Sequence, residues 1–155
     1  MRNVVDFLTG NLILNLAFMA WAAAQILKLL VVLITEHRWD WQHILSSGGM
    51  PSSHAAFVCA MASSIGYLYG LGSPLFAIAA GVAIVVMYDA FNVRRETGEQ
   101  GKVLNYMMEH WAQMKPEEIF DKAFKEFVGH TPFQVFMGAL LGVAMGWGGA
   151  LLINR

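Results

Sequence analysis

The chain has 155 residues, of which 57% are apolar and 14% are charged, and its formal net charge is −1. An average soluble domain has about 45–50% apolar and about 25% charged residues. The composition therefore excludes a disulfide-rich secreted domain, a disordered tail and a typical soluble enzyme, and it predicts one membrane domain over residues 1–155. The single cysteine, Cys59, has no partner for an internal disulfide. No basic stripe is present, so we expect no nucleic-acid partner.

Four apolar segments are long enough for membrane helices, which need about 20 mostly apolar residues. They cover about residues 12–35, 54–71, 74–91 and 132–154. The first is too long for a cleavable signal peptide, and none is expected. Only Gly72 and Ser73 separate the second segment from the third, which predicts a tight helical hairpin. We therefore predict an all-α fold, a polytopic membrane helix bundle with about four transmembrane helices.

The basic residues divide unevenly between the two sides of the membrane. With four spans, the loop before residue 54 and an excursion over residues 92–131 face the same side, here called side B. Side B holds seven basic residues: Arg38, Arg94, Arg95, Lys102, Lys115, Lys122 and Lys125. Only Arg2 and Arg155 fall on the other side. By the positive-inside rule we expect side B to be cytoplasmic and both chain ends to be outside.

The excursion contains a pattern typical of an amphipathic helix. Pro116, followed by two glutamates, fits the first turn of a helix. Five apolar residues recur behind it at helical spacing: Ile119, Phe120, Ala123, Phe124 and Phe127. We expect an interfacial helix that lies on the membrane surface, packs on the chain's own spans, or does both.

Glycines recur every four residues in the last apolar segment, at Gly138, Gly142 and Gly146. Small residues at this spacing let membrane helices approach closely. We favour packing within one chain over a contact between two copies.

The first apolar segment contains a lysine, Lys28, about seven residues or roughly 10 Å from its side B end. Charged residues inside membrane helices are costly and usually functional. Gln25 lies one turn earlier, so the two residues predict a polar stripe that faces inward. The structural alternative is a lysine that extends its side chain to the membrane interface.

A serine- and glycine-rich stretch, Ser46 to His54, leads directly into the second apolar segment. Glycines such as Gly49 let a backbone approach a ligand closely. Hydroxyls such as those of Ser52 and Ser53, with free N–H groups at a helix start, form an anion site. His54 can donate or accept a proton near neutral pH. A helix cap with a nearby interfacial histidine explains only one of the serines, so we favour a functional loop.

Two adjacent arginines, Arg94 and Arg95, follow Asp89 at the end of the third apolar segment. Their guanidinium groups can clamp a phosphate or meet lipid head groups. Asp89 can pair with one of them rather than touch a substrate. The functional and structural interpretations are about equally supported for each residue alone.

His130 stands immediately before the last apolar segment, on the same side as His54. The next residues fit a helix start, with Thr131 as the N-cap, Pro132 at the first helical position and Gln134 completing a capping box. The capping pattern does not explain His130.

Together these features indicate phosphoryl transfer on side B. One imidazole can attack phosphorus or activate water, and the other can protonate the leaving oxygen. Cationic groups would stabilise the transition state. No carboxylate cluster is evident in the sequence, so we expect neither a metal nor another cofactor.

Two segments resemble motifs of the type 2 phosphatidic acid phosphatase (PAP2) superfamily, which includes vanadium haloperoxidases. Pro51-Ser52-Ser53-His54 resembles its Pro-Ser-x-His motif, and His130 with the small-residue helix behind it resembles its last motif. The Gly-Gly-Met-Pro-Ser-Ser-His, Tyr88-Asp89 to Arg94-Arg95 and Gly-His-Thr-Pro elements more closely resemble the divergent branch of the superfamily. The resemblance extends from about Gln25 to Gly142.

The resemblance implies a helical membrane phosphatase of a bacterial inner or cell membrane. It implies that His130 is the nucleophile that forms a phosphohistidine and that His54 is the general acid. It also implies that Ser53 binds phosphate and that Lys28 matches the lysine of the first motif.

The sequence departs from the superfamily pattern at several positions. The Arg-Pro of the first motif is missing, and Arg38 is the nearest arginine to Lys28. Phe124 stands where an arginine is normal, so Arg94 or Arg95 would have to supply that charge. Gln134 replaces the aspartate that orients the nucleophile. The integral-membrane enzymes usually have six spans, and a homodimer would supply the missing helices.

Two functions remain open. The first is a phosphatase that hydrolyses a lipid phosphomonoester in the cytoplasmic leaflet. The second is a catalytically impaired protein on the same scaffold that binds or transports a lipid phosphate. A purely structural membrane subunit ranks last, because it leaves the serine-glycine loop unexplained.

Overall fold

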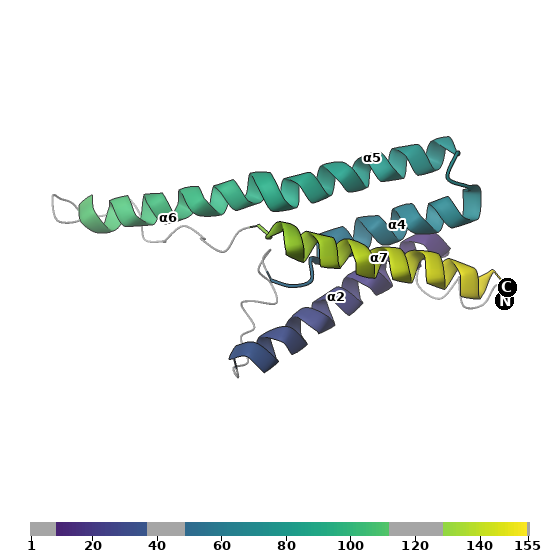
Figure 1. Cartoon of the computed structure of the whole chain (residues 1–155), viewed down its shortest axis with the longest axis horizontal. Helices are drawn as coiled ribbons and strands as arrows, with labels where there is room; N and C mark the ends of the chain where they lie inside the picture. Colours follow the sequence, from purple (N-terminus) through teal and green to yellow (C-terminus); the bar gives the residue numbers. More distant parts are fainter. Residues whose placement is uncertain (1–8, 37–48, 112–128, 155) are drawn as a thin grey trace.

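The computed structural model describes residues 9–36, 49–111 and 129–154, and these are almost entirely helical (Figure 1). The helices, in chain order, are α2 (Leu12–Glu36), α4 (Ser53–Tyr69), α5 (Pro74–Tyr88), the π-helix η1 (Asp89–Val93), α6 (Arg94–Trp111) and α7 (Pro132–Ile153). The described ranges contain no strand. The predicted interfacial helix behind Pro116 lies outside the described residues, as do Arg38 and the loop positions 46–48.

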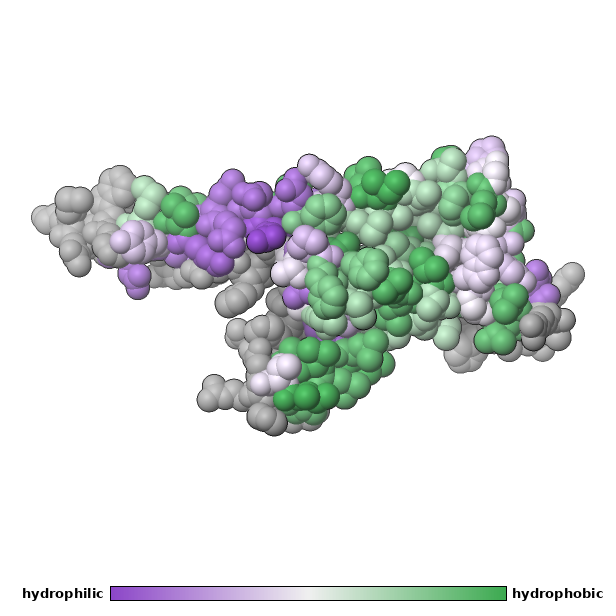
Figure 2. All heavy atoms as spheres, in the orientation of Figure 1, coloured by the Kyte–Doolittle hydropathy of each residue, from purple (hydrophilic) through white to green (hydrophobic). Residues whose placement is uncertain are grey.

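Within the described ranges, three helical stretches are long and apolar enough to cross a membrane: Leu12–Thr35, Pro74–Glu109 and Pro132–Ile153. Most of their apolar side chains face outward, as Ile34, Val85 and Leu152 do. In a membrane protein this outward face contacts lipid. Figure 2 shows the apolar surface over the bundle and a hydrophilic surface along α6. The predicted all-α membrane helix bundle is confirmed, whereas the number of spans and their orientation stay predictions.

The helices α5, η1 and α6 form one continuous rod (Figure 1). The apolar pattern predicts a third span that ends near residue 91 and an excursion behind it, but the helix continues to Trp111. No proline interrupts the chain between Pro74 and Trp111, so the polar sequence stays helical. An ion pair between Lys102 Nζ and Glu99 Oε1 at 3.0 Å supports this exposed part.

The predicted tight hairpin joins α4 to α5. The chain leaves α4 at Tyr69 and enters α5 at Pro74, with Ser73 as the N-cap. The Ser73 hydroxyl accepts a hydrogen bond from the Phe76 N–H at 3.2 Å. This cap and a proline at the first helical position define where α5 begins.

The helix α4 is the centre of the bundle and packs against α2, α5 and α7. Its closest neighbour is α7, whose three regularly spaced glycines press on the α4 backbone. A Cβ atom at Gly138 or Gly142 would collide with the carbonyl oxygens of Ser52 and Ala56, respectively. The glycine repeat therefore packs within this chain. It also fixes the starts of α4 and α7 side by side, and these starts carry the two motif histidines.

Candidate functional site

Three segments meet where α4 and α7 begin. The Ser52 N–H donates to the Gln134 carbonyl oxygen at 3.0 Å, which ties the start of α4 to the start of α7. The His130 N–H donates to the Ala90 carbonyl oxygen at 2.9 Å, which ties the residue before α7 to η1. The site is therefore built on helix ends that backbone hydrogen bonds connect to one another.

His54 and His130 come together in this arrangement. Their ring centroids are 6.2 Å apart and their planes meet at 63°. His54 is on the first turn of α4, and His130 immediately precedes the N-cap of α7. One phosphate group is large enough to contact both rings across this distance. The two imidazoles can thus act on the same phosphorus centre, one from each helix.

His130 is buried and unpaired. Only 2% of the residue is exposed, and neither ring nitrogen has a hydrogen-bond partner among the described residues. A buried polar group without a partner costs about 1–3 kcal/mol, so such groups often mark functional positions. An unpaired ring nitrogen that faces a ligand site is available for bonding to that ligand.

The pKa of His130 is lowered from its ordinary value to about 4. The main cause is burial, which disfavours the charged ring, and the positive charge of Lys28 acts in the same direction. The nearby polar groups of the Gln134 side chain and the Gly49 backbone raise the pKa and so oppose this shift only in part. His130 is therefore neutral near pH 7, which is the protonation state that a nucleophilic imidazole requires.

Lys28 faces the interior rather than the membrane interface. It lies within α2, and only 2% of the residue is exposed. The backbone of Gly49 packs on its alkyl chain: a Cβ at Gly49 would stand 3.1 Å from Lys28 Cδ. Gly49 also has a φ of +95°, which favours glycine. Gly49 thus packs against the lysine, and the charge of Lys28 acts on both His130 and His54.

The two serines before His54 are buried but differ in their contacts. The Ser52 hydroxyl accepts a hydrogen bond from the Ala55 N–H at 3.4 Å, so Ser52 is the N-cap of α4. The Ser53 hydroxyl has no hydrogen-bond partner among the described residues. Capping accounts for Ser52, whereas Ser53 keeps a hydroxyl free for a ligand at a helix N-terminus.

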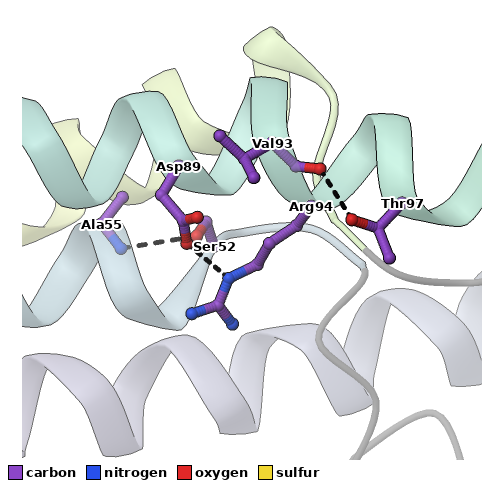
Figure 3. Close-up of polar contacts among 6 residues, drawn as sticks. All are labelled: Ser52, Ala55, Asp89, Val93, Arg94 and Thr97. Carbon is purple, nitrogen blue, oxygen red and sulfur yellow. Dashed lines mark hydrogen bonds and ion pairs between the residues drawn. The ribbon is translucent and has the colours of Figure 1, made fainter.

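The two arginines after η1 have different surroundings. Arg94 Nε donates to Asp89 Oδ2 (Figure 3), and its charge acts on His54. The Arg95 side chain is exposed, and what Arg95 contributes is its backbone, which lies against Gly129. A side chain at Gly129 would collide with that backbone, and its φ is +95°. The charge of Arg94 therefore acts on His54, whereas the Arg95 side chain is exposed.

Gln134 forms the predicted capping box. Its Oε1 accepts a hydrogen bond from the Thr131 N–H at 3.0 Å, and the Thr131 hydroxyl accepts one from the Gln134 N–H at 3.3 Å. The amide oxygen is therefore committed to the start of α7. No carboxylate or amide hydrogen bond orients the His130 ring from this position.

Sequence reasoning missed the π-helix and the role of the Ala90 carbonyl. A π-turn hydrogen bond joins residue i to residue i+5, as Arg94 N–H to Asp89 O does here. The five-residue spacing of Asp89 and Arg94 gave no signal of it, because such a pair does not meet on a regular α-helix. Among the described residues, no group of three His, Cys, Asp or Glu side chains is arranged to hold a metal.

A profile of the divergent PAP2 family matches residues 9–145, which include every residue of the candidate site described above. The chain belongs to the divergent PAP2 family. A relative from Bacillus subtilis (strain 168), named uncharacterized membrane protein YuiD, is 38% identical over 131 residues, or 79% of this chain and 83% of the relative. No solved structure matches the chain. The resemblance to the divergent PAP2 branch is thereby confirmed, and the converging residues lie within the matched region.

Proposed function

We propose that this divergent PAP2 protein is a membrane phosphatase that hydrolyses a lipid phosphomonoester through a phosphohistidine intermediate. The observation that carries the proposal is the 6.2 Å separation of the His54 and His130 rings. The buried Lys28 beside them supplies positive charge in a low-dielectric setting. A neutral imidazole, a second imidazole and a buried cation are the groups that phosphoryl transfer by covalent catalysis requires.

In the first step, a ring nitrogen of His130 attacks phosphorus with its lone pair. The N–P bond forms as the bond between phosphorus and the lipid oxygen breaks. The leaving oxygen takes a proton from His54, so the lipid alcohol departs neutral. In the second step His54 accepts a proton from water, the resulting hydroxide attacks phosphorus, and the N–P bond breaks. Inorganic phosphate leaves, and both histidines return to their starting protonation states.

Cationic and hydroxyl groups stabilise the charge on the transferring phosphoryl group. Lys28 and Arg94 provide the positive charges, and the free Ser53 hydroxyl provides a hydrogen-bond donor at the start of α4. Donors placed where charge develops in a transition state contribute most to such reactions. Arg38 and Arg95 are further candidates from the sequence; Arg38 lies outside the described residues.

The substrate class follows from the position of the site at the ends of membrane helices. A lipid keeps its acyl or prenyl chains among the apolar side chains while its phosphate reaches the histidines. Phosphatidic acid, phosphatidylglycerol phosphate and a polyprenyl phosphate all meet this description. We expect the reaction on the cytoplasmic leaflet, because most of the basic residues fall on the side of the motifs.

The proposal is tested by measuring phosphate release from these three lipids with protein purified in detergent. His130→Ala and His54→Ala should each lower turnover by about 10²–10⁴-fold. His110→Ala, which removes a histidine near the far end of α6, is the matched control and should retain activity. Unchanged turnover in either motif variant would overturn the mechanism.

A second function is favoured by one observation. Position 134 holds a neutral glutamine that caps α7, and no acidic side chain among the described residues pairs with the His130 ring. A protein with this site can bind or transport a lipid phosphate without cleaving it. This alternative predicts saturable binding of phosphatidic acid, no phosphate release, and binding that survives His130→Ala.

A further inference from the structure

The π-helix η1 creates an ion pair at the edge of the site. In η1 the backbone hydrogen bond runs from the Arg94 N–H to the Asp89 carbonyl oxygen, so these residues stack on one side of the rod. Their side chains then meet, and Arg94 Nε donates to Asp89 Oδ2. The π-turn therefore converts a five-residue spacing into a side-chain contact that a regular α-helix would not make.

The contact engages only one edge of the guanidinium group. Arginine presents five N–H donors in a fixed planar fork. Asp89 takes the Nε donor, and the partly exposed guanidinium group makes no further hydrogen bond to a described residue. Figure 3 shows the two Nη groups pointing away from Asp89 and toward α2, the helix that carries Lys28. A guanidinium held at Nε with its Nη groups free is arranged for two parallel hydrogen bonds to a phosphate.

The π-helix η1 also fixes the position of His130 relative to Arg94. The His130 N–H donates to the Ala90 carbonyl oxygen within η1. The preceding residue, Gly129, packs on the backbone at Arg94 and Arg95 so closely that no Cβ fits there. Arg94 and His130 are thus attached to one turn of the rod. Their relative position does not depend on long side chains.

We infer that Asp89 is a positioning residue: it fixes Arg94 at Nε so that the Nη fork of Arg94 receives the phosphate group handled by His54 and His130. This inference deepens the proposed function and rests on it. Arg94 would touch the substrate, whereas Asp89 would act only through Arg94. Two exposed charges that merely pair at a protein surface contribute about 0–1 kcal/mol to stability and nothing to catalysis.

A double-mutant cycle distinguishes these two roles. We would compare wild type with Asp89→Ala, Arg94→Ala and the double variant, measuring kcat/KM on a short-chain phosphatidic acid. Arg94→Ala should lower kcat/KM by about 10²–10³-fold, as loss of a transition-state donor does. Asp89→Ala should lower it about tenfold, in the range seen when a supporting residue is removed. If Asp89 acts through Arg94, the double variant should equal Arg94→Ala.

Conservative variants and a matched ion pair serve as controls. Asp89→Asn keeps an oxygen that accepts a hydrogen bond from Arg94 Nε, so its kcat/KM should be close to that of wild type. Arg94→Lys lacks the planar fork of donors, so its kcat/KM should stay close to that of Arg94→Ala. The Glu99–Lys102 pair lies further along the same rod and is similarly exposed, so Glu99→Ala and Lys102→Ala should leave kcat/KM unchanged. The inference would be overturned if Asp89→Ala lowered kcat/KM by the same factor in wild type and in the Arg94→Ala background. It would also be overturned if Glu99→Ala or Lys102→Ala lowered kcat/KM as much as Asp89→Ala does.

Binding of orthovanadate separates failure of this inference from failure of the proposed function. Vanadate resembles a transferring phosphoryl group and requires no turnover. If wild type releases no phosphate from any lipid, the phosphatase proposal is wrong, but the same cycle measured on vanadate affinity still decides the inference. The inference is supported if each single variant weakens vanadate binding and the double variant binds no more weakly than Arg94→Ala. It is overturned if the two losses add in the double variant or if neither variant weakens binding.

Discussion

The backbone N–H of His130 donates to the carbonyl oxygen of Ala90 at 2.9 Å. The residue is thus attached to the π-helix of another element rather than only to the helix that follows it. Pi-turns concentrate at functional sites because they alter which backbone groups are available and where side chains point. Here the π-turn does both, since it accepts the bond from His130 and pairs Asp89 with Arg94. The geometry of the site therefore depends on a backbone irregularity.

The pH dependence of turnover should reflect the lowered pKa of His130. Burial and the charge of Lys28 lower that pKa to about 4, so the ring becomes protonated, and loses its nucleophilic lone pair, only near that pH. The acidic limb of kcat/KM should therefore fall near pH 4 rather than near 6.5, the ordinary value for histidine. Assays of a soluble phosphomonoester between pH 3.5 and 8 measure it.

Lys28→Met provides the check on this assignment. Removing the cation should raise the pKa of His130 and move the acidic limb upward, while also lowering turnover. An acidic limb near pH 6.5 in wild type would show that a different histidine is the nucleophile.

The role of His54 can be separated from that of His130 by the leaving group. An alkoxide needs a proton as it departs, whereas p-nitrophenolate does not. His54→Ala should therefore lose far more activity on phosphatidic acid than in the first-turnover burst with p-nitrophenyl phosphate. His130→Ala should lose both the activity on phosphatidic acid and the burst with p-nitrophenyl phosphate. Equal losses on the two substrates in His54→Ala would exclude His54 as the general acid.

Gly49 should be required for a reason that is local and steric. Its φ of +95° costs other residues about 1–2 kcal/mol, and a new Cβ would press on Lys28 Cδ at 3.1 Å. Gly49→Ala should therefore lower turnover and weaken vanadate binding by displacing the lysine. Gly72→Ala is the control, because nothing lies within 4 Å of a Cβ there. Wild-type vanadate binding in Gly49→Ala would contradict a role for the close packing of Gly49 against Lys28.

The glycine repeat of α7 should determine the stability of the bundle. A Cβ at Gly142 would collide with the Ala56 carbonyl oxygen, and overpacking of this kind costs about 1–3 kcal/mol. Gly142→Ala should therefore lower the thermal unfolding temperature in detergent. Gly148→Ala meets no atom within 4 Å and should be neutral or stabilising, since alanine favours helix by about 1 kcal/mol over glycine. Similar unfolding temperatures would argue against this packing.

The helix bundle could be predicted because its signals are local. Apolar runs identify α2, and a serine or threonine followed by proline marks the starts of α5 and α7. The continuation of α5 into α6 could not, because a polar helix that projects beyond the bundle reads as a loop when only hydropathy is considered.

Part of the candidate site could likewise be predicted from the sequence, and part required the structure. His54, His130 and Lys28 stand out as costly polar residues at membrane helices, and residue type alone indicates their chemistry. The distinction between Arg94 and Arg95 depends on the π-turn, which leaves no mark in residue types. Likewise, the capping role of Gln134 was visible in the sequence, but its commitment to the Thr131 N–H rather than to the His130 ring required coordinates.

The central claim is a covalent bond between phosphorus and His130. The most direct measurement is quenching in alkaline SDS during turnover of a phosphate-labelled lipid by purified protein, followed by mass spectrometry at alkaline pH, because phosphohistidine hydrolyses in acid. We expect an acid-labile, alkali-stable phosphoryl group on His130 that appears before free phosphate, is absent in His130→Ala and persists longer in His54→Ala. Turnover with no protein-bound phosphoryl group, or with the group on another residue, would contradict the claim.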